Sequence, residues 1–204
     1  TIEQYRAFLK ATGDDSGVDW DDDDCPLENG GNYGLSGNKF GQDDQQPMVE
    51  VSWHGARKFC DWLSHKSGYT VRLPTEGQWE YACRAGSTTA YCFGDSKAQL
   101  GRYAWYDDNS GGKTHPVAQK QPNQCGLYDM HGNVYEWCRD WYDDNYYGNN
   151  AMTNPTGPTS GSSRVLRGGS WSFDARNARS ADRNSYDPAG SDGGNGFRGV
   201  SSPE

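Results

Sequence analysis

Cysteine and histidine are the residues of this sequence whose side chains could hold a transition metal or act as nucleophiles. The 204 residues include six cysteines and four scattered histidines. No two cysteines form a C-x-x-C pair, which argues against a zinc knuckle. Cys60 and Cys83 fall on the apolar faces of predicted helices, where we expect buried free thiols. Cys92 and Cys125 lie in turn-like surroundings and could form a disulfide, which an oxidising compartment would permit.

Carboxylates are concentrated between Asp14 and Gln46, in an acidic and glycine-rich stretch. Its centre is the run of four aspartates from Asp21 to Asp24. A calcium loop is one interpretation, but the D-x-D-x-D-G spacing of such loops is absent. We therefore interpret the stretch as a solvated loop.

One long segment near the end of the sequence has no apolar period. The 24 residues from Ser172 to Asn195, the 172–195 segment, contain no Leu, Ile or Val, which argues against a core strand or an amphipathic helix. Residues 165–171 predict a buried strand before it, and residues 196–198 predict a returning strand after it. A segment of this length inside a compact domain is either disordered or functional. The flanking strands favour a held, functional surface.

Composition limits the class of protein. Gly (27), Tyr (13) and Trp (8) are numerous, and the mean hydropathy is -1.02. No run approaches the roughly 20 apolar residues that a membrane span needs. The net charge of -9 argues against nucleic acid as a partner. Because Trp and Tyr supply large buried areas, we expect one loop-rich domain over residues 1–204. The chain opens inside a predicted helix with no visible signal peptide, so we expect it to be N-terminally incomplete.

Regular structure is predicted mainly in the first ninety residues, from helix caps and apolar periodicity. The predicted elements are a helix over 1–12, a strand over 47–51, a helix from Ser52 to Gly68, a strand over 71–73 and a helix from Thr75 to Gly86. From there to residue 122 we expect loops and turns.

Five blocks of sequence between residues 49 and 198 come in an order shared with a known family. They are VEVSW at 49–53, RLPTE at 72–76 with WEYA at 79–82, GLYDMHGNV at 126–134 with EW at 136–137, RGGSW at 167–171 and GFR at 196–198. Together they resemble the formylglycine-generating enzyme, or sulfatase-modifying factor, superfamily. The resemblance implies an α+β, C-type-lectin-like fold with little regular secondary structure, small antiparallel sheets and two to three helices.

The enzymes of that superfamily are copper-dependent oxidases that use two cysteines after the Arg-Gly-Gly-Ser block. In this sequence no residue from Ser172 onward is cysteine, and the two positions align near Phe173 and Ala178. Without a thiolate pair this stretch is unsuited to Cu(I). We therefore expect no copper and favour a protein that is not an enzyme.

The resemblance also implies a structural calcium loop at residues 129–136. Two carboxylates seven residues apart, around a tight glycine turn, can converge on a hard cation together with backbone carbonyls. The ligands carried over from the family are the side chains of Asp129 and Glu136 and the carbonyls of Gly132 and Val134. The alternative is a Gly-Asn turn whose acids face solvent.

The end of the sequence resembles, more specifically, the variable proteins of diversity-generating retroelements. Those proteins have this fold and carry a segment diversified at adenines between Arg-Gly-Gly-Ser-Trp and Gly-Phe-Arg. Diversified AAY codons cannot yield Lys, Glu, Gln, Met or Trp. The 172–195 segment contains none of these five, although the other 180 residues contain 34. The resemblance implies a ligand-binding region within residues 164–198; an ordinary polar loop of a non-catalytic relative is the alternative.

The segment is expected to divide into scaffold and contact positions. We expect Arg176, Arg179, Ser180 and Arg183 to belong to the scaffold, tying the loop to carbonyls and acids. The expected contact positions are Ser172, Phe173, Asp174, Asn177, Asp182, Asn184, Ser185, Tyr186, Gly190, Ser191, Asp192, Gly193, Gly194 and Asn195. Aromatic residues among small polar ones are also typical of antibody paratopes.

Three hypotheses for function follow. The first is a non-catalytic, receptor-like protein that presents a diversified surface to a protein or other macromolecular ligand, at a cell surface or on a phage particle. The second is a formylglycine-generating oxidase or another enzyme of the superfamily. The third is a structural accessory domain of an envelope protein.

Overall fold

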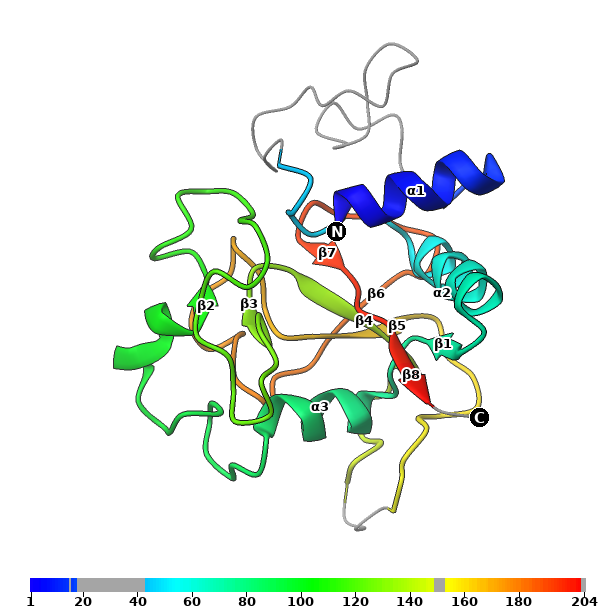
Figure 1. Cartoon of the computed structure of the whole chain (residues 1–204). Coiled ribbons are helices and arrows are strands. Elements are labelled where there is room, and N and C mark those ends of the chain that lie inside the picture. The colour runs from blue at the N-terminus through cyan, green and yellow to red at the C-terminus, as the bar shows by residue number, and fades with distance from the viewer. Residues whose placement is uncertain (15, 18–42, 149–152, 203–204) are drawn as a thin grey trace.

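Short helices and strands are set among long loops in this protein (Figure 1). The computed structural model describes residues 1–14, 16–17, 43–148 and 153–202. The helices are α1 (Ile2–Thr12), α2 (Trp53–Ser67), α3 (Glu76–Arg84) and the 3-10 helix η1 (Lys97–Arg102). The strands are β1 (Thr70–Arg72), β2 (Ala104–Trp105), β3 (His131–Gly132), β4 (Tyr135–Trp141), β5 (Arg164–Arg167), β6 (Asn184–Tyr186), β7 (Asn195–Gly196) and β8 (Val200–Ser202). This mixture confirms the α+β class. Among the described helices, none combines the length and the apolar character needed to cross a bilayer.

In the described part of the chain, the strands form three small sheets. The largest has the order β6-β5-β4-β7. Within it β4 runs antiparallel to β5 and β5 antiparallel to β6, whereas β4 and β7 are parallel. The other sheets are the antiparallel pair β1–β8 and the parallel pair β2–β3. The expectation of antiparallel sheets is therefore wrong for two pairs, because β3 and β7 are reached through long crossing loops rather than hairpins.

Capping residues set the helix starts that the sequence indicates. A capping box begins α1 at Thr1 and α3 at Thr75, and Ser52 caps α2. Each cap satisfies backbone N–H groups that the first helical turn leaves unpaired. The end of α3 comes one residue earlier than predicted, since Ala85, with φ 48°, takes the left-handed position expected for Gly86.

Two expectations concern the residues between α1 and α2. The strand predicted over residues 47–51 is wrong, because Glu50 has φ 53° and breaks the extended run. Met48, Val49 and Val51 are nevertheless buried. The acidic stretch before them falls largely on residues 18–42, which lie outside the described residues, so the solvated loop stays a prediction.

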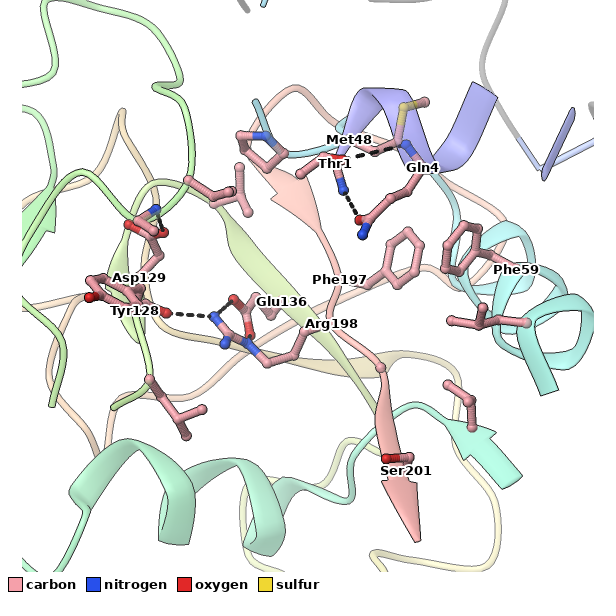
Figure 2. Close-up of a pocket in the computed structure, with 18 of the residues that line it drawn as sticks. Thr1, Gln4, Met48, Phe59, Tyr128, Asp129, Glu136, Phe197, Arg198 and Ser201 are labelled. Carbon is pink, nitrogen blue, oxygen red and sulfur yellow. Dashed lines mark hydrogen bonds and ion pairs between the residues drawn. The ribbon is translucent and has the colours of Figure 1, made fainter. Parts of the chain in front are cut away.

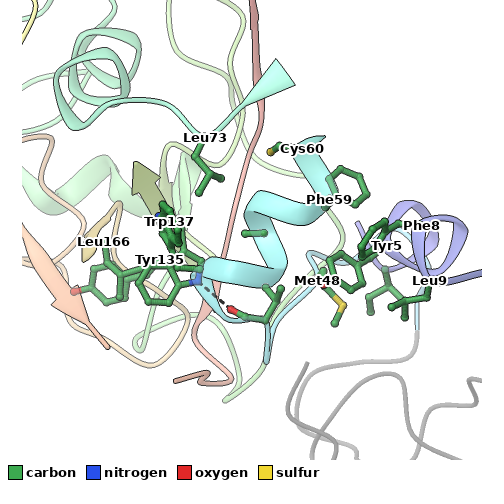
Figure 3. Packing of buried hydrophobic residues seen from close by; sticks show 14 residues of the cluster. Tyr5, Phe8, Leu9, Met48, Phe59, Cys60, Leu73, Tyr135, Trp137 and Leu166 are labelled. Carbon is green, nitrogen blue, oxygen red and sulfur yellow. Dashed lines mark hydrogen bonds between the residues drawn. The ribbon is translucent and has the colours of Figure 1, made fainter. Parts of the chain in front are cut away.

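The principal core lies between α1, α2 and the β4–β5 pair (Figure 3). Tyr5, Phe8 and Phe59 pack ring against ring, with centroids 5.2–5.9 Å apart. Trp137 is fully buried at the centre, and its indole Nε1 donates a hydrogen bond to the carbonyl of Val51 at 2.9 Å. Aromatic side chains thus supply the buried area that the few aliphatic residues cannot.

Candidate binding surface and calcium loop

A buried arginine holds the strand that leads into the 172–195 segment. Arg167, at the end of β5, is 0% exposed. Its Nε lies 3.2 Å from Oε1 of Glu76, its Nη2 pairs with Glu80, and its guanidinium faces the ring of Trp79. Its Nη1 also donates to the backbone carbonyl of Asp182. The end of β5 is therefore hydrogen-bonded directly to the backbone of the 172–195 segment.

A second arginine joins the same network from within the segment. Arg183 donates from Nε and Nη2 to the two carboxylate oxygens of Glu76, at 2.6 and 2.9 Å, and from Nη1 to the carbonyl of Asp143. Its guanidinium faces the rings of Tyr142 and Tyr147. Bidentate, charge-assisted bonds to a buried carboxylate are strong and directional. Arg183 therefore acts as scaffold, as the sequence predicts.

Buried small residues hold the first half of the segment. Ala175, Ala178 and Ser180 are all buried, the first two in a core cluster. The hydroxyl of Tyr91 donates to the carbonyl of Ala175 at 2.8 Å, and Nδ1 of His131 donates to the carbonyl of Ala178 at 2.7 Å. Burial lowers the pKa of His131 to about 4, so the imidazole is neutral at pH 7. The segment therefore does contribute to the core, through residues too small to mark an apolar period.

Hydrogen bonds to its backbone hold the second half of the 172–195 segment in place. Residues Asn184–Tyr186 form β6 at the edge of the main sheet, although their polar character argued against a strand. The indole of Trp171 donates to the carbonyl of Gly193, and the amide of Tyr135 donates to the carbonyl of Gly194. Gly193, Gly194 and Asn195 are consequently buried, so the expectation that these three contact a ligand needs correction.

The remaining predicted contact positions face outward between these anchors. Phe173 and Tyr186 are 40% and 38% exposed. Each ring lies near an aromatic side chain of β4. The ring of Phe173 lies edge-on to that of Tyr135, with centroids 5.2 Å apart, and the ring centroid of Tyr186 lies 6.3 Å from that of Trp137. Ser172 and Asp192 are also exposed. The half-buried positions are Asp174, Asn177, Asp182, Asn184, Ser185, Gly190 and Ser191.

Two arginines expected in the scaffold are exposed, although Arg179 does donate from Nε to the carbonyl of Arg176 at 2.8 Å. The Arg176 side chain is 85% exposed and pairs with Asp174, which lowers the pKa of that carboxyl. Arg179 pairs with Asp182 at 3.2 Å; burial nevertheless raises the pKa of Asp182. Exposed pairs of this kind contribute little to stability. Both signs of charge are therefore presented beside the exposed aromatic rings.

Phe173 is exposed and Ala178 is buried; the family resemblance predicts the two oxidase cysteines near these residues. The described cysteines are all free, so Cys92 and Cys125 are not paired in this structure. Cys83 lies below the segment, with Sγ 3.6 Å from Oγ of Ser180. Burial raises the pKa of Cys83 to about 12 and that of Cys92 to about 11, so both are thiols rather than thiolates at pH 7.

One carboxylate of the predicted calcium loop, that of Glu136, pairs with an arginine (Figure 2). Both oxygens of Glu136 accept from Arg198 at 2.5 Å, and Oε2 also accepts from the indole of Trp79 at 2.7 Å. Oδ2 of Asp129 accepts from the amide of Ala118, but its Oδ1 is buried without a hydrogen-bond partner. Burial raises the pKa of Asp129. The loop borders a cavity of about 840 Å³ whose lining is shown in the same figure.

The tight turn of this loop depends on glycine. Gly132 has φ 74°, and a Cβ there would lie 2.2 Å from the carbonyl oxygen of Trp105. The amide of Gly132 donates to the carbonyl of Gly168 at 2.7 Å, which joins the loop to the end of β5. The 129–136 loop and the 172–195 segment are therefore both hydrogen-bonded to the end of β5.

The residues of the loop fit a hard cation in one respect, the unpartnered carboxylate oxygen of Asp129. A cation held by Asp129, Glu136 and the carbonyls of Gly132 and Val134 would compete with Arg198 for Glu136. Among the described residues, no three His, Cys, Asp or Glu side chains group as a metal site. The backbone carbonyls are therefore essential to any calcium site here.

Sequence reasoning missed the network of Glu76, Glu80, Arg167 and Arg183. A signal existed, since Glu76 and Arg167 are charged residues inside sequence blocks that are otherwise buried. Buried charges are almost always paired, so two buried charges of opposite sign indicate a pair. The sequence does not show that they pair with each other, because 91 residues separate them.

Comparison with known proteins gives matches over nearly the whole chain. Residues 1–203 match the family described as sulfatase-modifying factor enzyme 1-like domain. The formylglycine-generating enzyme of Streptomyces coelicolor is 38% identical over an alignment of 168 residues, which covers 74% of this chain and 51% of that enzyme. The chain spans between about a quarter and a half of the curated relatives it matches.

Two solved structures are similar along nearly its full length. Treponema denticola variable protein 1 superposes with a TM-score of 0.79 at 30% identity, covering 98% of this chain and 80% of that one. PvdO from Pseudomonas aeruginosa superposes with a TM-score of 0.82 at 30% identity, covering 98% of this chain and 77% of that one.

Proposed function

This chain belongs to the sulfatase-modifying factor enzyme 1-like family, and we propose that within it the protein is a non-catalytic binding protein. The outward-facing side chains of its 172–195 segment are the contact surface for a macromolecular ligand, and the buried Gly193, Gly194 and Asn195 are not part of it. The observation that carries this proposal is the division of the segment into buried anchors and outward side chains. Because the anchors hold the backbone, the outward side chains can change without disturbing the fold.

The similarity to a protein named as variable supports this reading. The surface itself offers two exposed rings, Phe173 and Tyr186, with charges and small polar groups around them. Rigid aromatic anchors among adaptable polar groups suit a protein ligand. The rings rest on Tyr135 and Trp137, so little conformational freedom is lost when they bind.

The second candidate is a formylglycine-generating oxidase, which the 38% identity to the Streptomyces enzyme favours. The side chains at the two aligned positions favour the binding protein, because neither Phe173 nor Ala178 can act as a thiolate. The nearest thiol below the segment, Cys83, is buried and protonated.

The 129–136 loop is proposed to bind calcium as a structural ion. Calcium would neutralise the buried carboxylate of Asp129 and link the turn at Gly132 to β4 through Glu136. The bound calcium would stabilise the 129–136 loop and β4, which support the contact surface. Arg198 would then be released from Glu136.

Sequencing the gene from many isolates tests the binding proposal without knowledge of the ligand. We expect amino-acid variation at the outward positions, represented by Phe173, Asn177 and Tyr186, and none at the anchors Ala178 and Arg183. We also expect a reverse-transcriptase gene nearby and a near-copy of the coding stretch for residues 164–198. Equal variation at anchors and outward positions would refute the proposal.

A library test examines the surface directly. Randomising the codons for Ser172, Phe173, Asp174, Asn177 and Tyr186 should produce folded variants, and selection should recover binders to hen-egg lysozyme. A matched library at the anchors should produce mostly unfolded protein. Failure of the first library to yield folded variants would show that these side chains are structural.

A further inference from the structure

A second cavity, of about 510 Å³, opens beside α2, the end of β4 and the start of β5. Four arginines line it, together with two aspartates, although the chain as a whole carries a net charge of -9. The arginines are Arg57, Arg72, Arg139 and Arg164. Neither the 172–195 segment nor the calcium loop uses these side chains.

Arg164 forms one wall of this cavity in an unusual setting. Its guanidinium carbon lies 3.9 Å from the ring centre of Trp53 and 3.4 Å from that of Trp141. Its Nη1 donates to the carbonyl of Arg139 at 2.6 Å, but its Nε is buried without a hydrogen-bond partner. Buried N–H groups without an acceptor are rare in folded proteins. The two rings fix the direction of this unused donor.

Two further guanidinium groups are available at the same cavity. Within the described part of the chain, neither Arg57 nor Arg139 makes an ion pair, although Arg57 lies 5.6 Å from the ring of Trp53. Arg72 is engaged, since it donates to Gln78 and to the carbonyl of Leu73. Guanidinium groups without an ion pair among the described residues are therefore available on α2 and on β4, and Arg164 at the start of β5 lines the same cavity.

The aspartates reduce this positive charge without cancelling it. Oδ2 of Asp140 accepts from the amide of Glu76 at 3.0 Å. Oδ1 of Asp140 is buried without a hydrogen-bond partner in the described ranges, and an added Cβ at Gly157 would lie 3.0 Å from it. Asp61 is exposed at the edge of α2. The loop over residues 156–159, which contains Gly157, adds the hydroxyl groups of Thr156 and Thr159.

We propose that this cavity binds a phosphate monoester. Three guanidinium donors approaching from separate elements suit an anion with at least three oxygens, whereas a carboxylate has two. The cavity lies within the range of about 300–1,000 Å³ for small-molecule sites and exceeds what a bare phosphate ion fills. The remaining space accommodates the organic part of the ester. Arg164 pairs with Tyr186 in the β5–β6 register, so the site adjoins one end of the contact surface.

Calorimetric titration of the whole chain, in a phosphate-free buffer of low ionic strength, tests the site. The probes are phenyl phosphate, inorganic phosphate and acetate, at matched ionic strength. Phenyl phosphate should bind saturably at one site, tighter than inorganic phosphate and at least tenfold tighter than acetate. The double variant Arg57→Gln, Arg139→Gln should weaken phenyl phosphate binding at least tenfold. Both side chains are exposed, and circular dichroism will verify that the variant folds.

The matched control is Arg176→Gln, which removes an exposed guanidinium from the contact surface, outside this cavity. It should leave the affinity for phenyl phosphate within twofold of that of the unmodified protein. Absence of saturable binding, or equal affinity in the double variant, would overturn the proposal. Equal affinity for acetate would overturn the choice of phosphate, and tighter binding of inorganic phosphate would overturn the choice of an ester.

Discussion

Replacing Glu76 by glutamine should strongly destabilise the protein, because this buried carboxylate pairs with both the buried Arg167 and the half-buried Arg183. Glu76 is 1% exposed, Arg167 is 0% exposed, and the Arg183 side chain is 17% exposed. At the contact distances of 2.6–3.2 Å, each pair attracts by about 5–6 kcal/mol at an effective dielectric of about 20. Glutamine has nearly the same shape, so the loss comes from charge and not from a cavity. The lower desolvation cost of the neutral side chain offsets part of it, which leaves a net cost of about 3–5 kcal/mol.

Thermal denaturation measures this loss. For a chain of this size, 1 kcal/mol corresponds to about 2–4 °C in Tm, so we expect a decrease of about 6–20 °C. Hydrogen exchange should also accelerate in residues 182–186, which Arg167 and Arg183 hold. The matched control is Asp174→Asn, the same chemical change at an exposed pair, which should leave Tm and exchange unchanged.

A second variant keeps the test useful if Glu76→Gln does not fold. Arg183→Met leaves the Glu76–Arg167 pair intact and should cost about 1.5–3 kcal/mol, the value of hydrogen bonds to a charged group. The network does not anchor the segment if the free energy of unfolding of Glu76→Gln is within about 1 kcal/mol of that of the unmodified protein. The same conclusion follows if Arg183→Met leaves hydrogen exchange in residues 182–186 unchanged.

Three further predictions concern metal, chemistry and pH. At calcium concentrations near 100 times Kd, calcium should stabilise the fold by about 2.7 kcal/mol; chelator should reverse this, Asp129→Ala should abolish it, and a Tm indifferent to both would remove the site. With copper and oxygen present, the purified chain should leave the cysteine of a sulfatase-derived peptide unmodified, and formylglycine detected by mass spectrometry would favour the oxidase. Burial raises the pKa of Asp140 from 3.8 to about 6, so its contribution to stability is present below about pH 4 and is lost as pH rises through 6. Asp140→Asn should therefore gain stability relative to the unmodified protein between pH 4 and 7, by up to about 3 kcal/mol, and a difference independent of pH would contradict this.

The helix starts, the fold family and the polar character of the 172–195 segment were predictable from the sequence. Caps at Thr1, Ser52 and Thr75 depend on side chains that reach only two or three residues along the chain. The five ordered blocks indicate the family for a similar reason, since each is a short run whose spacing is visible directly. The polar composition of the segment likewise marks it as unsuited to a continuous core strand.

Tertiary structure alone decided which residues of that segment are inside. Ala178 packs in a cluster with Tyr91 and accepts from His131, and the amide of Ser180 donates to the carbonyl of Ala90. Small side chains carry no signal of this burial in the sequence. Partners far apart in sequence are decided in the same way. Glu76 and Arg183, 107 residues apart, meet only when α3 packs beside β5. Local preferences extend over one helical turn, whereas burial and charge pairing depend on contacts between distant elements, which is why the anchors and the arginine-lined cavity appear only in the folded chain.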